Sequence, residues 1–269
     1  MFPELNAVLN WSPDDVTQGQ FVLLSDRRSD ASFLVHHFLS FYIRGRCRVC
    51  FLGLVQSFSH YSAVCQRLGV NLSQARERGQ LTFLESLNEA LTVLSPSEGQ
   101  IGSGYLDFLR SPSLGLRGLF QFICSSLSGP GASDGEWGPP VLLVDDLSVL
   151  LGLGVDVAAL LDFSHYCRAS ICSQLQGNVV MLVRCEGQEE DYADDEDSER
   201  LLKGLTHQCD LSIKVQGLPT GYCRDIHGQM QVSWKNRATG QYSHERLLQY
   251  KVHDKGASFF ARGTSAAVL

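Results

Sequence analysis

The chain has 269 residues, of which 44% are hydrophobic, and its formal net charge is −7. A chain of this length can bury roughly 70–75% of its unfolded surface, and no linker rich in Pro, Gly and Ser divides it, so we expect one domain over residues 1–269. The net charge argues against a protein that binds nucleic acid through its overall charge.

The amino-terminal segment does not resemble a secretory signal. MFPELNAVLNWSPDD lacks the basic region and the long apolar stretch of a secretory signal. No apolar run in the sequence approaches the roughly 18 residues of a membrane span. We therefore expect a cytoplasmic and nuclear location and no association with membranes.

A phosphate-loop position with altered residues follows the first predicted strand, Phe21–Asp26 (FVLLSD). A nucleotide-binding loop between a strand and a helix has the pattern G-x-x-x-x-G-K-[ST]. In this frame Ser25 and Asp30 stand for the two glycines, Ala31 stands for the lysine, and only the hydroxyl of Ser32 remains. The loop therefore keeps its place in the chain but loses most of its chemistry.

These replacements make nucleotide binding unfavourable. The Asp30 carboxylate would repel a phosphate by about 4 kcal/mol at a distance of about 4 Å and an effective dielectric constant near 20. The helix N-terminus favours an anion by only about 0.3–1 kcal/mol. Arg27 and Arg28 do not occupy the position of the lysine. We therefore expect no catalytic residue, no cofactor and no nucleotide hydrolysis by this chain alone.

The remaining segments predict an α/β fold. Asp30 is the expected N-cap of a helix that ends at Ile43, and a closing meander of antiparallel strands follows Asp210. Between them strands and helices alternate, which predicts a mostly parallel mixed sheet with helices on both faces. The predicted strands are Cys47–Val55, Leu81–Ser86, Pro140–Leu147 and Asn178–Cys185, and the predicted helices are Ser59–Val70, Leu114–Leu127 and Val155–Leu175, with an irregular connection at Leu91–Ser113.

Two aspartates end the strand VLLVDD. Asp145 occupies the place where phosphate-loop proteins put a magnesium-associated carboxylate, and Asp146 lies beside it. The pattern is weak because many apolar strands end in aspartate. Since the lysine is missing, we favour the alternative that both residues cap the next segment.

An acidic segment follows the strand Asn178–Cys185. Glu186–Glu199 contains nine carboxylates and no basic residue, which predicts a solvated, mobile loop over residues 186–200, with an acidic docking site as the alternative. Without these nine charges the formal net charge changes from −7 to +2. The sequence therefore does not exclude a local basic patch outside this acidic segment.

The cysteines and histidines do not predict a metal site. Cys47 and Cys50 have metal-ligand spacing, but no second pair completes four ligands, and alternation along a strand places the two thiols on opposite faces. His36 and His37 lie in an apolar helix, where packing is the expected role. We expect no bound metal.

The order of these segments resembles a RecA-like ATPase core without its active site. Seven segments narrow the resemblance to the family of the sixth subunit of the Elongator complex, and the similarity extends nearly from end to end. These segments are Phe33–Tyr42, Gln56–Val64, Ala75–Leu81, Pro140–Leu151, Leu161–Ala169, Gly221–Gln229 and Ser258–Leu269.

The resemblance implies a RecA-like, non-catalytic subunit. Members of this family assemble with two related subunits, the fourth and fifth, into a hetero-hexameric ring that supports wobble-uridine modification of transfer RNA and binds that RNA. Because the acidic segment should repel phosphates, we expect any RNA contact of this chain to use basic residues outside it. The candidates are Arg200, Lys203, Lys214 and Arg224.

Two other functions stay open at this point. A free-standing adaptor would bind a protein partner through the acidic segment. An atypical NTPase would bind nucleotide with magnesium as an isolated chain.

Overall fold

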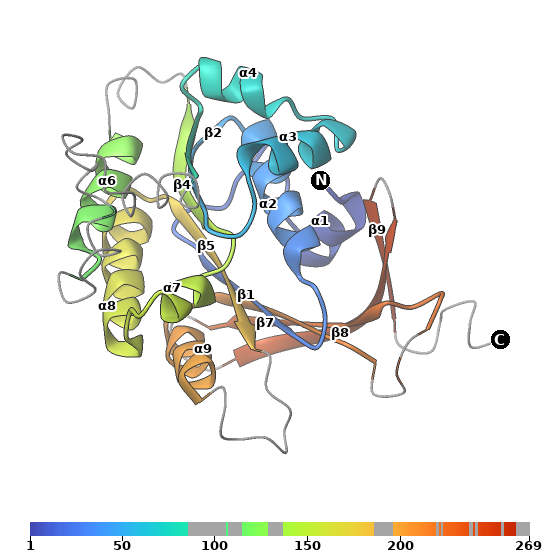
Figure 1. Ribbon diagram of the computed structural model, residues 1–269. Helices are drawn as coiled ribbons and strands as arrows, with labels where there is room; N and C mark the ends of the chain where they lie inside the picture. The colour runs from blue at the N-terminus through green and yellow to red at the C-terminus, as the bar shows by residue number, and fades with distance from the viewer. Residues whose placement is uncertain are drawn as a thin grey trace.

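Nine strands form one sheet in the order β3-β2-β4-β5-β1-β6-β7-β8-β9 in the computed structural model of the chain (Figure 1). The structure describes residues 1–85, 106, 115–128, 137–185, 196–218, 221, 223–236, 239, 242–253 and 256–261. The strands are β1 (Phe21–Arg27), β2 (Cys47–Gly53), β3 (Leu81–Glu85), β4 (Gly138–Val144), β5 (Asn178–Cys185), β6 (Leu211–Gln216), β7 (Gly228–Lys235), β8 (Tyr242–His253) and β9 (Gly256–Ala261).

The sheet is parallel from β3 to β6 and antiparallel from β6 to β9. This mixed arrangement confirms the predicted fold class. The helices are α1 (Pro3–Leu9), α2 (Ser32–Arg44), α3 (Phe58–Arg67), α4 (Leu72–Glu77), α6 (Arg117–Ser128), α7 (Ser148–Gly152), α8 (Val157–Cys167), the π-helical η3 (Arg168–Gln174) and α9 (Glu196–Gln208). None of these helices is long and apolar enough to cross a membrane.

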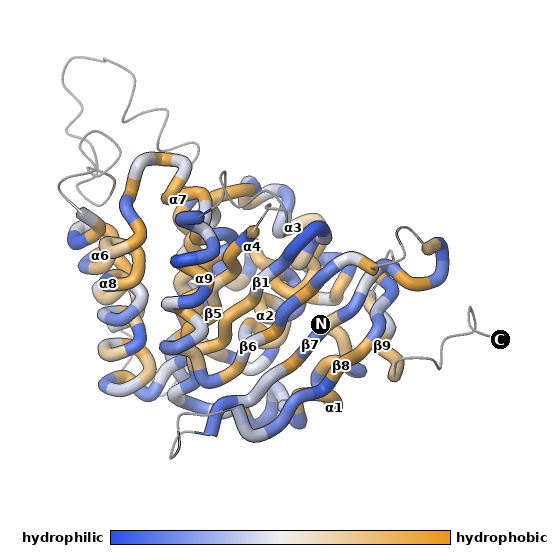
Figure 2. Tube along the Cα trace, turned by 90° about the horizontal axis from the view of Figure 1, so that it is seen from below, coloured by the Kyte–Doolittle hydropathy of each residue, from blue (hydrophilic) through white to orange (hydrophobic). Residues whose placement is uncertain are grey.

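Alternate residues of each central strand enter two separate cores. Val22 and Leu24 of β1 pack in the core beneath α1–α4, whereas Phe21 and Leu23 pack in the core beneath α6–α9. Figure 2 shows α6, α8 and α9 together on one side of the sheet. Because β1 is covered on both faces, it needs the nearly continuous apolar sequence that predicted it.

Helix α2 is buried on all sides. Every residue from Phe33 to Ile43 is buried, because the helix lies between the sheet and α3, and Phe2, just before α1, packs on Phe33 and His37. A helix that is apolar all round needs such surroundings. The helix that follows the phosphate-loop position is therefore a core element of the fold.

Two predictions of local structure were wrong, and a third is not tested. Asp30 is not the N-cap of α2, because Ala31 occupies that position and the Asp30 carboxylate instead accepts the Ser32 N–H, at 2.8 Å. The predicted helix Val155–Leu175 is divided, since its second half is the π-helical η3. The predicted irregular connection Leu91–Ser113 lies outside the described residues, apart from Leu106.

The predicted acidic loop is shorter than residues 186–200. Residues 186–195 lie outside the described part of the chain, but Glu196 begins α9. The helix dipole favours acidic side chains in the first turn. Leu201 and Leu205 lie one turn apart on the same face of α9, and both are buried. The carboxylates at 196–199 therefore belong to a helix start.

Candidate functional site

The phosphate-loop position lies where three parallel strands end. Strands β1, β4 and β5 are neighbours in the sheet, so their carboxyl ends share one edge. This edge carries Asp26 from β1, Asp145 and Asp146 after β4, and Arg184 near the end of β5. Ligands of open α/β sheets bind at this kind of edge.

The Asp26 carboxylate binds the loop backbone. Its Oδ2 accepts the Ala31 N–H at 3.0 Å and lies 3.3 Å from Nε of Arg184. Asp26 is only 2% exposed. A carboxylate of this chain therefore binds a backbone N–H of the kind that would receive a phosphate in a working loop.

Arg184 supplies the cation of this site. Its guanidinium lies 3.4 Å from Asp30 and 3.7 Å from Asp146, in addition to its contact with Asp26. Burial lowers the pKa of Arg184, but the three carboxylates outweigh burial and raise it. One guanidinium among three carboxylates leaves the site negatively charged when all are ionised. A polyphosphate would meet repulsion here.

The Asp145 carboxylate accepts hydrogen bonds from groups of the chain itself. Its Oδ1 accepts the Leu54 N–H at 2.7 Å, and its Oδ2 accepts the Val55 N–H at 3.0 Å and the Tyr61 hydroxyl at 2.8 Å. The carboxylate thus joins the end of β4 to the segment after β2 and to α3. Its role is to connect elements, not to cap the next segment as predicted.

Asp146 does bind the next segment, as predicted. Its Oδ1 accepts the Ser148 N–H at 2.9 Å and the Ser148 hydroxyl at 2.7 Å, which holds the start of α7. Burial raises the pKa of both Asp145 and Asp146. These buried carboxylates depend on internal hydrogen bonds for their stability.

The remaining loop residues are anchored in the fold. Ala31 is fully buried, and Ser25 is 3% exposed. The Ser29 hydroxyl lies 2.6 Å from the Tyr250 hydroxyl of β8, and Arg27 pairs with Glu199 of α9. Because Ala31 occupies the place of the lysine, the start of α2 supplies no cation. The cation of the site is Arg184 of β5.

The buried carboxyl of Asp26 predicts a pH dependence of stability. Burial raises its pKa to about 6, although the Ala31 N–H and Arg184 lower it. The unfolded chain has an Asp pKa of about 3.9. The contribution of Asp26 to stability is therefore complete below about pH 4 and is lost as the pH rises through 6.

We expect the variant Asp26→Asn to gain stability relative to the wild type by about 2 kcal/mol between pH 4 and pH 7. The asparagine can still accept the Ala31 N–H but does not titrate. Urea unfolding of both proteins at constant ionic strength measures the difference. A difference that stays constant across this range would contradict a raised pKa.

The four predicted RNA-contact residues come from three segments: α9, β6 and the connection before β7. Arg200 and Lys203 are exposed on α9, and Arg200 lies 3.3 Å from Asp197. Lys214 is half-buried on β6, and Arg224 is exposed before β7. Their role in RNA binding stays a prediction.

The predicted placement of Cys47 and Cys50 on opposite faces of a strand is confirmed. Cys47 packs in the core under α1–α4 and Cys50 in the opposite core. Burial lowers the pKa of His36 to about 4 and that of His37 to about 3. The described residues contain no group of three His, Cys, Asp or Glu suited to a metal ion.

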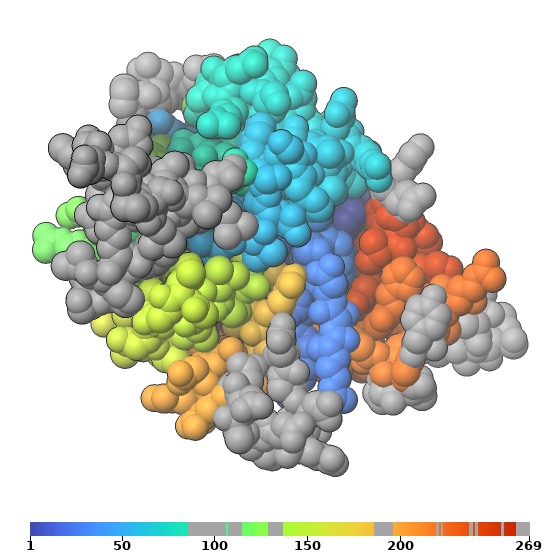
Figure 3. Space-filling model, in the orientation of Figure 1, coloured from blue at the N-terminus to red at the C-terminus, as the bar shows by residue number. Residues whose placement is uncertain are grey.

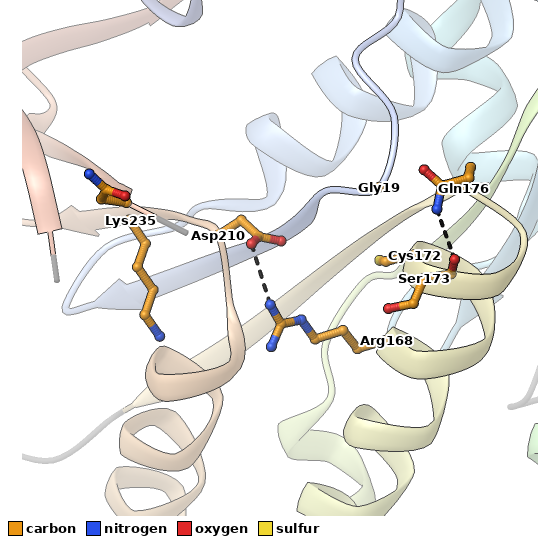
Figure 4. Close-up of a pocket in the computed structure, with 8 residues that line it drawn as sticks. Gly19, Arg168, Cys172, Ser173, Gln176, Asp210 and Lys235 are labelled. Atoms are coloured by element: carbon orange, nitrogen blue, oxygen red, sulfur yellow. Dashed lines mark hydrogen bonds and ion pairs between the residues drawn. The ribbon is translucent and has the colours of Figure 1, made fainter. Parts of the chain in front are cut away.

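A separate pocket of about 430 Å³ lies at the amino ends of β1, β5 and β6 (Figure 4). Figure 4 shows Arg168 joined to Asp210, at 3.4 Å, and the same carboxylate accepts the Phe21 N–H at 2.9 Å. The pocket lies at the opposite edge from Asp26 and Arg184. It is therefore not part of the phosphate-loop position.

The fold and this edge define the class: a RecA-like domain whose phosphate-loop position is occupied by its own carboxylates and one arginine. An uncharacterized protein from Pyrococcus horikoshii, crystallised with an unknown peptide, has the same fold. It matches with a TM-score of 0.60 and 13% identity over 96% of each chain, a likeness that shows the fold alone.

Sequence comparisons give the family. A family model described as Elongation complex protein 6 matches residues 2–254. Proteins named Elongator complex protein 6 from Danio rerio and Homo sapiens are 61% and 49% identical to this chain, over 100% of each chain. A protein of that name from Dictyostelium discoideum is 21% identical and covers 97% of this chain and 99% of its own. The chain belongs to the Elongator complex protein 6 family.

The most important site residue that sequence reasoning missed is Arg184. The available signal was a single charged residue near the end of the strand NVVMLVRC. Since the carboxyl ends of parallel strands meet at one edge, this arginine could have been placed beside Asp26 and Asp146. The order of the strands, which makes β1 the neighbour of β5, had to be known first.

Proposed function

We propose that this chain is a non-catalytic subunit of the Elongator complex. It assembles with two related RecA-like subunits, the fourth and fifth, into a hetero-hexameric ring that binds transfer RNA and supports modification of its wobble uridines. Its place of action is the cytoplasm and the nucleus. Membership of the family supports the proposal that the chain is part of the Elongator complex. The residues at the phosphate-loop position support the proposal that it is not catalytic.

The observation that carries the non-catalytic role is the contact of Arg184 with Asp26, Asp30 and Asp146. A bound nucleotide would have to separate these pairs and approach uncompensated carboxylates. Breaking a buried ion pair costs several kcal/mol because one charge is left without a partner. The site therefore holds the loop in place and requires no cofactor.

Restoring the lysine is not expected to restore nucleotide binding. Ala31 packs fully buried in the core, so Ala31→Lys should lower the free energy of unfolding by about 3 kcal/mol through overpacking and a buried charge. The matched control is Asp30→Lys, because the Asp30 side chain is 71% exposed and a change there should cost under about 1 kcal/mol. Urea unfolding and titration with Mg-ATP measure both properties. Micromolar binding of Mg-ATP by Ala31→Lys would contradict this account.

Co-expression with the two related subunits tests the proposed assembly. We expect the native mass of the purified complex to correspond to two copies of each of the three subunits. A free-standing adaptor would remain outside that complex. An atypical NTPase would remain a monomer and hydrolyse ATP, and either result would overturn the proposal.

A further inference from the structure

Three exposed arginines make no ion pair within the described part of the chain. Arg46 lies in the turn between α2 and β2, Arg67 is the last residue of α3, and Arg78 follows α4. No described carboxylate lies within ion-pairing distance of their guanidinium groups.

Hydrogen bonds between the turns bring these arginines to one surface. The Gln80 side chain donates to the carbonyl oxygens of Ile43, at 2.8 Å, and Cys47, at 3.1 Å. This joins the turn that contains Arg78 to the turn that contains Arg46. The two turns lie at the amino ends of β3 and β2, which pair in parallel.

The end of α3 is joined to the same surface through Arg44. Its Nη2 donates to the Leu68 carbonyl oxygen at 2.7 Å, directly after Arg67. Arg76 of α4 is also exposed, and its guanidinium lies over the Phe58 ring, 5.2 Å from the centroid. Figure 3 shows α3 and α4, in cyan, on the outside of the molecule. We call Arg44, Arg46, Arg67, Arg76 and Arg78 the arginine surface.

Within the described part of the chain, the acidic groups around the arginine surface are fewer than its arginines. Glu77 is exposed on α4. Asp14 and Asp15 belong to the loop whose Pro13 and Val16 lie beside Gly45. Among the described residues, five guanidinium groups therefore face three carboxylates. Helix α9 differs, because its first turn carries Glu196, Asp197 and Glu199.

We propose that the arginine surface binds the phosphate backbone of the RNA in the assembled complex, an inference that rests on the proposed function. Guanidinium groups donate two parallel hydrogen bonds to phosphate oxygens and stay charged at every physiological pH. Contacts to phosphates position an RNA without reading its sequence. The surface thus gives an acidic subunit a local region of positive potential.

The test uses the full chain assembled with its two related subunits. The variant R46Q/R67Q/R78Q removes the three unpaired arginines and leaves Arg44 and Arg76 in their contacts. We expect transfer RNA affinity to fall about tenfold at low salt, and the slope of log affinity against log salt to become shallower by about 2. The variant R46K/R67K/R78K, which keeps the charges, should retain that slope. Native mass must show the same assembly for all proteins.

The matched control is R28Q/R117Q/R246Q, which has the same change of net charge at exposed arginines outside the arginine surface. An equal loss of affinity in this control would overturn the arginine surface, because the loss would then follow the net charge alone. Unchanged affinity and slope in R46Q/R67Q/R78Q would overturn the role of the arginine surface while leaving the proposed function intact. A wild-type complex that binds no RNA would overturn both the role of the arginine surface and the proposed function. Binding of polyglutamate in place of RNA would assign the surface to an acidic protein.

Discussion

Replacing Arg184 with methionine is expected to lower the free energy of unfolding by about 2–3 kcal/mol at pH 8. The change leaves the side chains of Asp26 and Asp146, which are 2% and 6% exposed, without their cation. Breaking a buried pair costs about 3–5 kcal/mol, and we expect less here because the Arg184 side chain is 34% exposed. Urea unfolding of the purified chain at pH 8 and pH 5 measures the effect.

The pH and a second substitution separate this mechanism from simple loss of packing. Protonation of Asp26 near pH 6 reduces the need for the guanidinium, so the loss should be smaller at pH 5. R184K keeps the charge and should lose less than R184M. The double variant D146N/R184M removes one unpaired carboxylate and should recover part of the loss. A loss of equal size at both pH values would contradict the electrostatic account.

Replacing Asp145 with alanine is expected to destabilise the chain by at least about 3 kcal/mol. The substitution leaves the N–H groups of Leu54 and Val55 and the Tyr61 hydroxyl without their acceptor. Each buried donor without a partner costs about 1–3 kcal/mol. Thermal and urea unfolding should both show the loss, and Asp145→Asn should lose less because it keeps one acceptor oxygen.

A double-mutant cycle with Tyr61→Phe provides the control for Asp145. Phenylalanine removes one donor and should cost about 1 kcal/mol. The double variant D145A/Y61F should be more stable than the sum of the two losses implies, because the tyrosine donor is no longer left unsatisfied. If Asp145 instead served as a magnesium ligand, the opposite result is expected. Removing its carboxylate would relieve the repulsion between neighbouring carboxylates and leave the stability of the chain unchanged or increased.

The central strands could be predicted from sequence because their burial leaves a direct signal. Residues of β1 and β5 are apolar on both faces, since helices cover each side of the sheet. In the meander, β6 alternates between buried and half-buried residues, and turn-like residues separate the strand segments in the sequence. These features depend on neighbouring residues alone, so no knowledge of the fold was needed.

Elements whose residues have mixed signals were missed. Helix α9 begins in an acidic run that composition assigned to a loop, and only the buried Leu201 and Leu205 reveal its face. Helix α1 has seven residues and begins with Pro3. The π-helical turns of η3 follow α8 without a break in the apolar pattern. Contacts between residues distant in sequence determine where these three helices form.

The site was predictable only in part for the same reason. The altered residues Ser25, Asp30 and Ala31 predict that the phosphate chemistry is lost, and this stays a prediction. They do not indicate which contacts the loop makes in the folded chain. One such contact joins Arg184 of β5 to Asp26 of β1, which lie 158 residues apart in sequence but on adjacent strands. A parallel sheet forms such pairs, and a local pattern cannot show them.

The loop therefore has a structural role. The Ala31 N–H binds Asp26, Ser29 binds Tyr250, and α2 fills the core behind the loop. Removing these contacts would disturb β1, α2 and β8 together. A subunit that contributes shape to an assembly can keep the strand-loop-helix arrangement without keeping its phosphate chemistry.

Calorimetric titration of the isolated full chain with Mg-ATP tests the central claim most directly. The account predicts no binding at nucleotide concentrations up to the millimolar range, with Asp26 and Arg184 still in contact. A subunit with a working phosphate loop, measured alongside, shows that the assay detects binding. Magnesium-dependent binding by the wild-type chain, weakened when Asp145 is replaced by asparagine, would contradict it.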